Sequence, residues 1–212
     1  MNKRVYAVFY MFCLTLVFTS LVTVAKVVNE ERIAVNQQAN RQRVILTVLK
    51  ISQAFTAPRD EIARLFASHI SESEAGGRTI YSAHDPVSKE GLGHAFALRG
   101  IGFWGPIEAM VGVDAELSRV LAIEFYRHQE TPGLGARITE PWFTEQFAGL
   151  SLVEEPGDEG FFTISPPAPD KPALELDAVT GATLTTRAVE TFVNQELQMI
   201  KDLGRAWQKG EQ

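Results

Sequence analysis

The chain begins with an apolar stretch long enough to cross a membrane. Residues 5–25 contain no charged side chain, and a helix of that length, at about 1.5 Å per residue, spans the roughly 30 Å hydrocarbon core. A signal peptide cleaved after Ala25 is the alternative, but signal cores usually have roughly 7–15 apolar residues. Lys3 and Arg4 precede the stretch and only Lys26 closely follows it. This charge pattern predicts a single-pass cell (inner) membrane protein with a cytoplasmic N-terminus and an extracytoplasmic, periplasmic main domain.

A helical pattern follows the apolar stretch. Residues 27–55 contain no Gly or Pro, so the helix is expected to continue as a stalk over residues 27–57. Residues 36–42 are expected to stay solvated. A second amphipathic helix is predicted over residues 57–70, with Pro58 and Asp60 near its start. The late apolar residues of the stalk are expected to pack on the domain: Val44, Ile45, Leu46, Val48, Leu49 and Ile51.

From Arg78 the pattern changes to short alternating runs broken by glycine. These runs predict strands over residues 78–83, 93–100, 107–114 and 119–127, and their short links favour an antiparallel sheet. A short helix is expected from Pro141 to an exit at Gly149. The loop-rich residues 154–173 contain one brief predicted strand at 161–164.

A final helix is predicted over residues 185–203, because apolar residues recur every three or four positions. The fold class is therefore α+β, with a central antiparallel sheet flanked by helices. We divide the chain into residues 1–26 (N-terminus and anchor), 27–57 (stalk) and 58–212 (domain). The final helix is expected to bury Val189, Phe192, Val193, Leu197, Ile200 and Leu203.

Composition and charge exclude several functions. The net charge of −6, with no cluster of Lys and Arg, argues against a nucleic-acid partner. Cys13 is the single cysteine, so the exported domain has no disulfide. The four histidines have no metal-ligand spacing with one another, so no metal site is expected.

Residues 100–105, Gly-Ile-Gly-Phe-Trp-Gly, match the G-x-G-x-x-G pattern of dinucleotide sites. That pattern binds pyrophosphate only when its third glycine opens a helix. Here Pro106 and a strand-like run follow, so we interpret the segment as a turn between strands. The sequence also lacks a G-x-S-x-G elbow and a phosphate loop, so a hydrolase or nucleotidase has little support.

The stretch DAVTGATLTT at residues 177–186 has two interpretations. In the simpler one, Gly181 forms a turn and Thr183 or Thr185 caps the following helix. In the other, the helix N-terminus offers unpaired N–H groups and a positive dipole end to a phosphate. Small residues at Gly181 and Ala182 would let the phosphate approach the backbone.

Residues 177–183 resemble the D-x-x-[ST]-G-A-T signature of the FMN-binding domain family, which is found in the C subunit of the sodium-translocating NADH:quinone oxidoreductase and in the G subunit of the Rnf complex. The resemblance implies that Thr183 carries FMN through a phosphoester bond, although Thr185 and Thr186 are nearby hydroxyls. It also implies that Asp177 and Thr180 help present Thr183, although Asp177 is equally well explained as a turn residue. The expected cofactor-binding set here is Asp177, Thr180, Gly181, Ala182, Thr183, Leu184 and Thr185.

Two further stretches are similar to the same family. Residues 128–138 resemble its E-T-P-G-L-G loop, which lies against the flavin, although a Pro-Gly turn alone would explain them. Residues 100–114 resemble the segment in which an aromatic residue approaches the flavin. Trp104 is the candidate, and burial in the core is its alternative. The expected contacts are Trp104, Glu130, Thr131, Pro132, Gly133 and Leu134.

Together the resemblances imply a membrane-anchored electron-transfer flavoprotein. It would act as a relay subunit of an ion-translocating oxidoreductase, without catalytic residues or a complete reaction of its own. Its partners would be the other membrane subunits and a flavin transferase that installs FMN from FAD. The alternatives are an anchored binding or assembly module without flavin, and a stand-alone exported FMN reductase.

Overall fold

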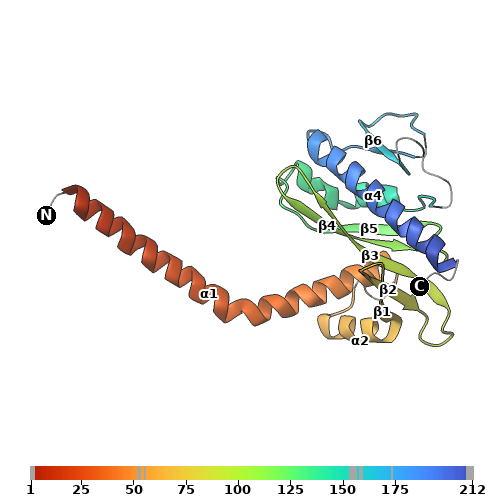
Figure 1. Ribbon diagram of the computed structural model, residues 1–212, viewed down its shortest axis with the longest axis horizontal. Coiled ribbons are helices and arrows are strands. Elements are labelled where there is room, and N and C mark those ends of the chain that lie inside the picture. Colours follow the sequence, from red (N-terminus) through yellow and green to blue (C-terminus); the bar gives the residue numbers. More distant parts are fainter. Residues whose placement is uncertain are drawn as a thin grey trace. The chain divides into compact units, whose positions relative to one another are not determined.

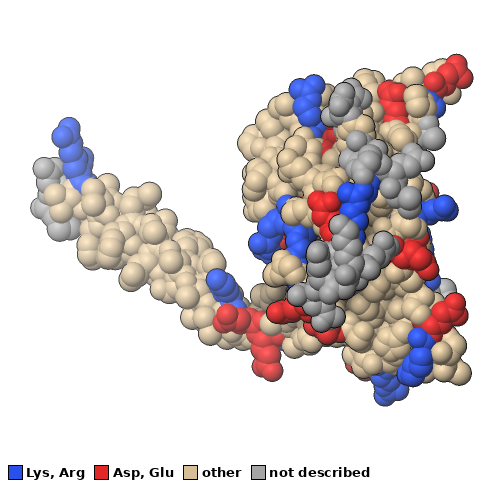
Figure 2. Space-filling view, turned by 45° about the vertical axis from the view of Figure 1, so that its right-hand side comes forward, with Lys and Arg blue, Asp and Glu red and all other residues tan. Residues whose placement is uncertain are grey.

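The computed structural model describes residues 3–51, 54, 56–152, 157, 160–172 and 174–208. The long N-terminal helix α1 (Lys3–Val48) contains the predicted span. Its apolar part is long enough to cross a membrane, a test that a signal sequence also passes. Figure 2 shows this part as an uncharged stretch with charged side chains at both ends. The chain divides into two compact units, residues 1–41 and 42–212.

The second unit is built on a five-stranded antiparallel meander (Figure 1), which confirms the predicted sheet. The four predicted strands are present, and the sequence pattern misses a fifth, β1. Ile70 of β1 is buried, but Ser71 to Glu74 are exposed. A polar edge strand lacks the apolar alternation by which strands are recognised. The strands are β1 (Ile70–Ala75), β2 (Arg78–His84), β3 (Gly91–Ile101), β4 (Pro106–Val113) and β5 (Val120–Arg127).

Helices cover both faces of this sheet. The long C-terminal helix α4 (Thr183–Gln208) packs across one face, where Phe192 lies directly on Gly100 of β3. Residues at the end of α1 and α2 (Arg59–His69) form a second core with the other face. Five residues expected to dock there are indeed buried: Ile45, Leu46, Val48, Leu49 and Ile51.

The final helix begins two residues earlier than predicted and carries the expected apolar face. Val189, Phe192, Val193, Leu197 and Ile200 are buried in the main core, and Leu203 packs against it. The packing of this apolar face on the sheet brings the N-terminus of α4 to the turn that joins β3 to β4. Residues of both segments lie together at one end of the helix–sheet contact.

Short elements connect β5 to α4. Two short 3-10 helices, η2 (Gly135–Thr139) and η3 (Glu145–Phe147), flank the short helix α3 (Pro141–Thr144). Gly149 then turns the chain with φ of 88°, at the predicted exit. The brief strand β6 (Thr163–Ser165) begins two residues later and ends one residue later than predicted. It pairs in parallel with β7 (Glu175–Asp177), which the sequence pattern does not predict. Part of the loop around residues 153–159 lies outside the described residues.

Candidate cofactor-binding site

A cavity of about 350 Å³ lies where the β3–β4 turn, the loop after β5 and the start of α4 meet. Ligand sites usually measure roughly 300–1,000 Å³, so this cavity lies at the lower end of that range. Nine of the predicted cofactor-binding residues line it: Trp104, Glu130, Thr131, Leu134, Gly181, Ala182, Thr183, Leu184 and Thr185.

The threonines in the first turn of α4 have different environments. Thr185 is 3% exposed and its hydroxyl donates to Oε2 of Glu130 at 2.6 Å. Thr186 is 2% exposed and its hydroxyl donates to the carbonyl of Ala182 at 2.9 Å. Thr183 is exposed, lines the cavity, and has no hydrogen bond from its hydroxyl among the described residues. Thr183 therefore has the most accessible hydroxyl of these three.

The chain enters α4 through a tight glycine turn. Gly181 has φ of 80°, a conformation that glycine adopts without strain, and the Ala182 N–H donates to the Val179 carbonyl at 3.0 Å. In the described part of the chain, the N–H groups of Thr183, Leu184 and Thr185 form no backbone hydrogen bond. Such N–H groups and the positive end of the helix dipole favour an anion at the cavity mouth.

Exposed apolar side chains surround the cavity. Trp104 is 63% exposed and Phe103 is 51% exposed, with their rings edge to face at 4.9 Å between centroids. Leu134 and Leu184 line the cavity and are also exposed. Trp104 is thus not a core residue, and the alternative interpretation of a buried aromatic is wrong. Phe103 also lines the cavity, although the sequence resemblance points to only one aromatic of the Phe-Trp pair.

Glu130 is the one charged residue among the described residues that line the cavity. It is 4% exposed, and its Oε1 accepts a hydrogen bond from the backbone N–H of Trp104 at 3.1 Å. Its own backbone N–H donates to Nδ1 of His128 at 3.2 Å, so this half-buried histidine neighbours the site without lining the cavity. Gly135, the other lining residue that the sequence does not predict, lies beside the Glu130 carboxylate.

Four predicted residues are not in the cavity lining. Thr180 is exposed in the turn before α4, and Pro132 and Gly133 are exposed in the loop after β5. Asp177 ends β7, where its Oδ1 lies 2.8 Å from Nζ of Lys171. A role for Asp177 through contact with the cavity is therefore not supported by its position.

The glycines of residues 100–105 are explained by close packing. The segment forms the β3–β4 turn, in which the Gly102 N–H donates to the Gly105 carbonyl at 2.8 Å. A Cβ at Gly100 would lie 2.2 Å from Phe192, and one at Gly102 would lie 2.4 Å from Glu130. The strand β4 follows this turn in place of a helix, so the prediction that it is not a dinucleotide site is consistent with the fold.

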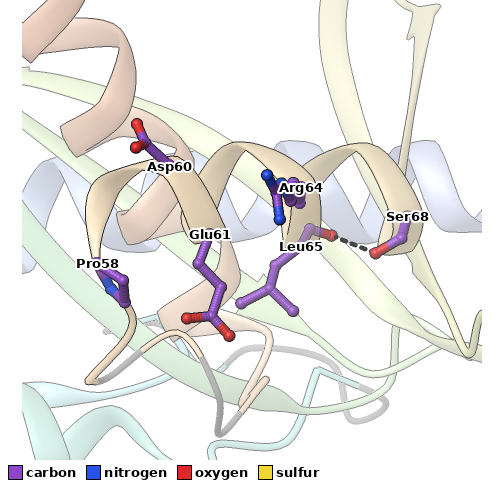
Figure 3. Close-up of a pocket in the computed structure, with 6 residues that line it drawn as sticks. All are labelled: Pro58, Asp60, Glu61, Arg64, Leu65 and Ser68. Atoms are coloured by element: carbon purple, nitrogen blue, oxygen red, sulfur yellow. Dashed lines mark hydrogen bonds between the residues drawn. The ribbon is translucent and has the colours of Figure 1, made fainter.

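A larger hollow of about 530 Å³ runs along α2 (Figure 3), but its side chains do not converge. Figure 3 shows the carboxylate of Asp60 pointing away from that of Glu61, and the Ser68 hydroxyl bonded to the carbonyl of Leu65. It is a surface depression along one helix. Among the described residues, no group of His, Cys, Asp and Glu is arranged to hold a metal ion.

Comparisons with known proteins agree on one family. The sequence model of the FMN-binding domain family matches residues 102–198 of this chain. The G subunit of an ion-translocating oxidoreductase complex from Pseudomonas aeruginosa is 33% identical over 189 residues, which cover 86% of this chain and 82% of the relative. The C subunit of the Na(+)-translocating NADH-quinone reductase of Chlamydia muridarum is 34% identical over 128 residues. That alignment covers 53% of this chain and 40% of the relative, so the chain spans less than half of that protein.

The crystal structure of Shewanella oneidensis NqrC has the same fold. It superposes with a TM-score of 0.64 at 18% sequence identity, over 79% of this chain and 97% of the other. At this identity the likeness concerns the fold alone.

Proposed function

Because this chain belongs to the FMN-binding domain family, we propose that it carries FMN covalently on Thr183 and acts as an electron-transfer subunit of an ion-translocating oxidoreductase complex of the Rnf or Na⁺-NQR type. The bound flavin would supply the redox chemistry. The chain would supply the anchor, the attachment point and the cavity. The membrane helix would hold the domain on the extracytoplasmic side, as the charges of Lys3 and Arg4 predict.

The observation that carries this proposal is the exposed, unbonded hydroxyl of Thr183 at the mouth of an apolar cavity in the described part of the chain. Phe103, Trp104, Leu134 and Leu184 offer surfaces to a flat aromatic ring. The first turn of α4 offers N–H groups to a phosphate. The residues present therefore fit FMN, with its ring system against the apolar walls and its phosphate at Thr183.

The cavity also explains why a covalent bond is useful. Its described lining contains no lysine or arginine, and its one charge is the carboxylate of Glu130. A site that holds a phosphate by charge usually uses Arg or Lys. Here helix N–H groups alone would face a doubly charged phosphate. An ester bond would keep the cofactor attached where noncovalent binding is weak.

The attachment step is a transfer of FMN from FAD by a separate flavin transferase. The Thr183 hydroxyl loses its proton and forms the new P–O bond, the pyrophosphate bond of FAD breaks, and AMP leaves. Thr185 and Thr186 are poor acceptors in comparison, because their hydroxyls are buried and already donate hydrogen bonds.

The test is intact mass spectrometry of the full chain, purified in detergent after co-expression with a flavin transferase. Wild type is expected to gain the mass of FMN less one water and to keep its yellow colour after denaturation. Thr183→Ala should remain unmodified, whereas Thr186→Ser, the matched control, should be modified. An unmodified wild-type chain would favour the binding or assembly module, and flavin released by acid would favour the stand-alone reductase.

A further inference from the structure

We infer that the Glu130 carboxylate is a positioning residue that holds three segments of the cavity together and, by its charge, sets the reduction potential of the flavin. This inference rests on the proposed function. It concerns a residue whose contacts the sequence pattern alone does not reveal.

Glu130 joins elements that are far apart in the sequence. Its Oε2 accepts from the Thr185 hydroxyl in the first turn of α4, at 2.6 Å. Its Oε1 accepts from the backbone N–H of Trp104 in the β3–β4 turn, at 3.1 Å. Glu130 itself belongs to the loop after β5. One carboxylate thus fixes the aromatic turn and the attachment helix relative to each other.

The surrounding chain leaves space for this carboxylate at two glycines. A Cβ at Gly102 would lie 2.4 Å from Oε1, and a Cβ at Gly135 would lie 2.8 Å from Oε2 and 2.6 Å from the Thr185 hydroxyl. Real Cβ contacts are longer than these values, so any larger residue would displace the carboxylate or the backbone. The close approach on both sides keeps the carboxylate in one place.

The charge of Glu130 is not balanced by a cation in the described part of the chain. None of the ion pairs among the described residues includes Glu130, and no described residue that lines the cavity is Lys or Arg. The carboxylate is 4% exposed, so water screens its field poorly. A fixed negative charge beside a redox group disfavours the addition of an electron. Glu130 should therefore lower the flavin potential.

The experiment compares flavin potentials of full-length variants loaded with FMN by the transferase. Glu130→Gln removes the charge and keeps both contacts, since the Thr185 hydroxyl can rotate to accept from the new amide. At the wild-type midpoint potential, its ratio of reduced to oxidised flavin should rise on the order of tenfold, which is about 59 mV for a one-electron couple. Glu130→Asp, which restores the charge at a shorter reach, should lie between Glu130→Gln and wild type.

Glu61→Gln is the matched control, because it makes the same chemical change on the exposed surface of α2, outside this cavity (Figure 3). Its potential should equal that of wild type. A second readout uses flavin-free protein: Glu130→Asp should unfold at a lower temperature than Glu130→Gln, since the shorter side chain cannot reach both donors. The role in positioning would be refuted by equal unfolding temperatures.

The outcomes separate this inference from the proposed function. If wild type takes up no flavin, the proposed function fails. If wild type is flavinylated and Glu130→Gln shifts the potential no more than Glu61→Gln, the inference about the charge fails alone. Should Glu130→Gln not fold, Thr185→Val is the second variant. It removes the hydroxyl that donates to the Glu130 carboxylate, so the negative charge of Glu130 is stabilised by one hydrogen bond fewer. Its potential is then expected to move in the negative direction, and a positive shift would contradict the inference.

Discussion

Replacing Gly100 with alanine tests whether this glycine serves packing. A Cβ at this position would lie 2.2 Å from Cγ and 2.3 Å from Cδ1 of Phe192. The Phe192 ring is 6% exposed and belongs to the main core, so it has little room to move. Overpacking of this kind costs about 1–3 kcal/mol. The smaller unfolded-state entropy of alanine offsets roughly 0.4–1 kcal/mol of that.

The assay is thermal unfolding of the full chain in detergent, followed by near-UV circular dichroism. A loss of about 1–2 kcal/mol lowers Tm by roughly 2–8 °C for a chain of this size. Phe192→Leu should relieve the clash, so the double variant should lose about 0.5–3 kcal/mol less than the sum of the single changes. Gly149→Ala is the control, because a Cβ there meets no atom within 4 Å; its φ of 88° adds backbone strain that does not depend on Phe192. Its effect should add to that of Phe192→Leu. An equally additive effect for Gly100→Ala would refute the packing argument.

Three further predictions concern other parts of the domain. Gln146→Ala should lower the free energy of unfolding by about 1–3 kcal/mol in urea titrations, because the Gln146 amide accepts the Asp177 N–H at 2.5 Å and donates to its carbonyl at 3.3 Å. Burial raises the pKa of Glu124 above 4.5, and Lys50 opposes that shift. The destabilising effect of burying the charged Glu124 carboxylate is absent below the unfolded-state pKa and grows as pH rises through the folded-state pKa. Glu124→Gln should therefore be more stable than wild type at pH 7 and equal to it below about pH 4 in urea titrations. Gly181→Ala should slow FMN attachment in a time course of intact mass and destabilise the chain by about 1–2 kcal/mol, because φ of 80° strains any other residue.

The sequence predicts elements well where one periodicity dominates. The alternation in β3, β4 and β5 and the three-to-four spacing in α4 both identify the buried faces. The polar strand β1 escapes because Ser71 to Glu74 gain little from burial and are held by pairing with β2. The parallel pair of β6 and β7 is hard to predict because each strand has only three residues. Its pairing is a tertiary contact that no local pattern records.

The site is predicted unevenly for a related reason. The motif residues of the loop after β5 share a short stretch of sequence, yet Glu130, Thr131 and Leu134 face the cavity whereas Pro132 and Gly133 do not. Which side chains face inward depends on the turn of the backbone there. The role of Glu130 depends on contacts with segments 26 and 55 residues away in sequence, which a single sequence does not reveal.

The distinction among the threonines of α4 is nevertheless present in the sequence. Residues three and four positions before Val189 lie on the same helix face as Val189 itself. Those positions are Thr186 and Thr185, and both are buried. Thr183 precedes Val189 by six positions. At about 3.6 residues per turn, this spacing puts the two side chains on different faces of the helix, so Thr183 is turned away from the core. The periodicity that packs α4 on the sheet therefore leaves the Thr183 hydroxyl exposed, and the same helix rotation directs Thr185 onto Glu130.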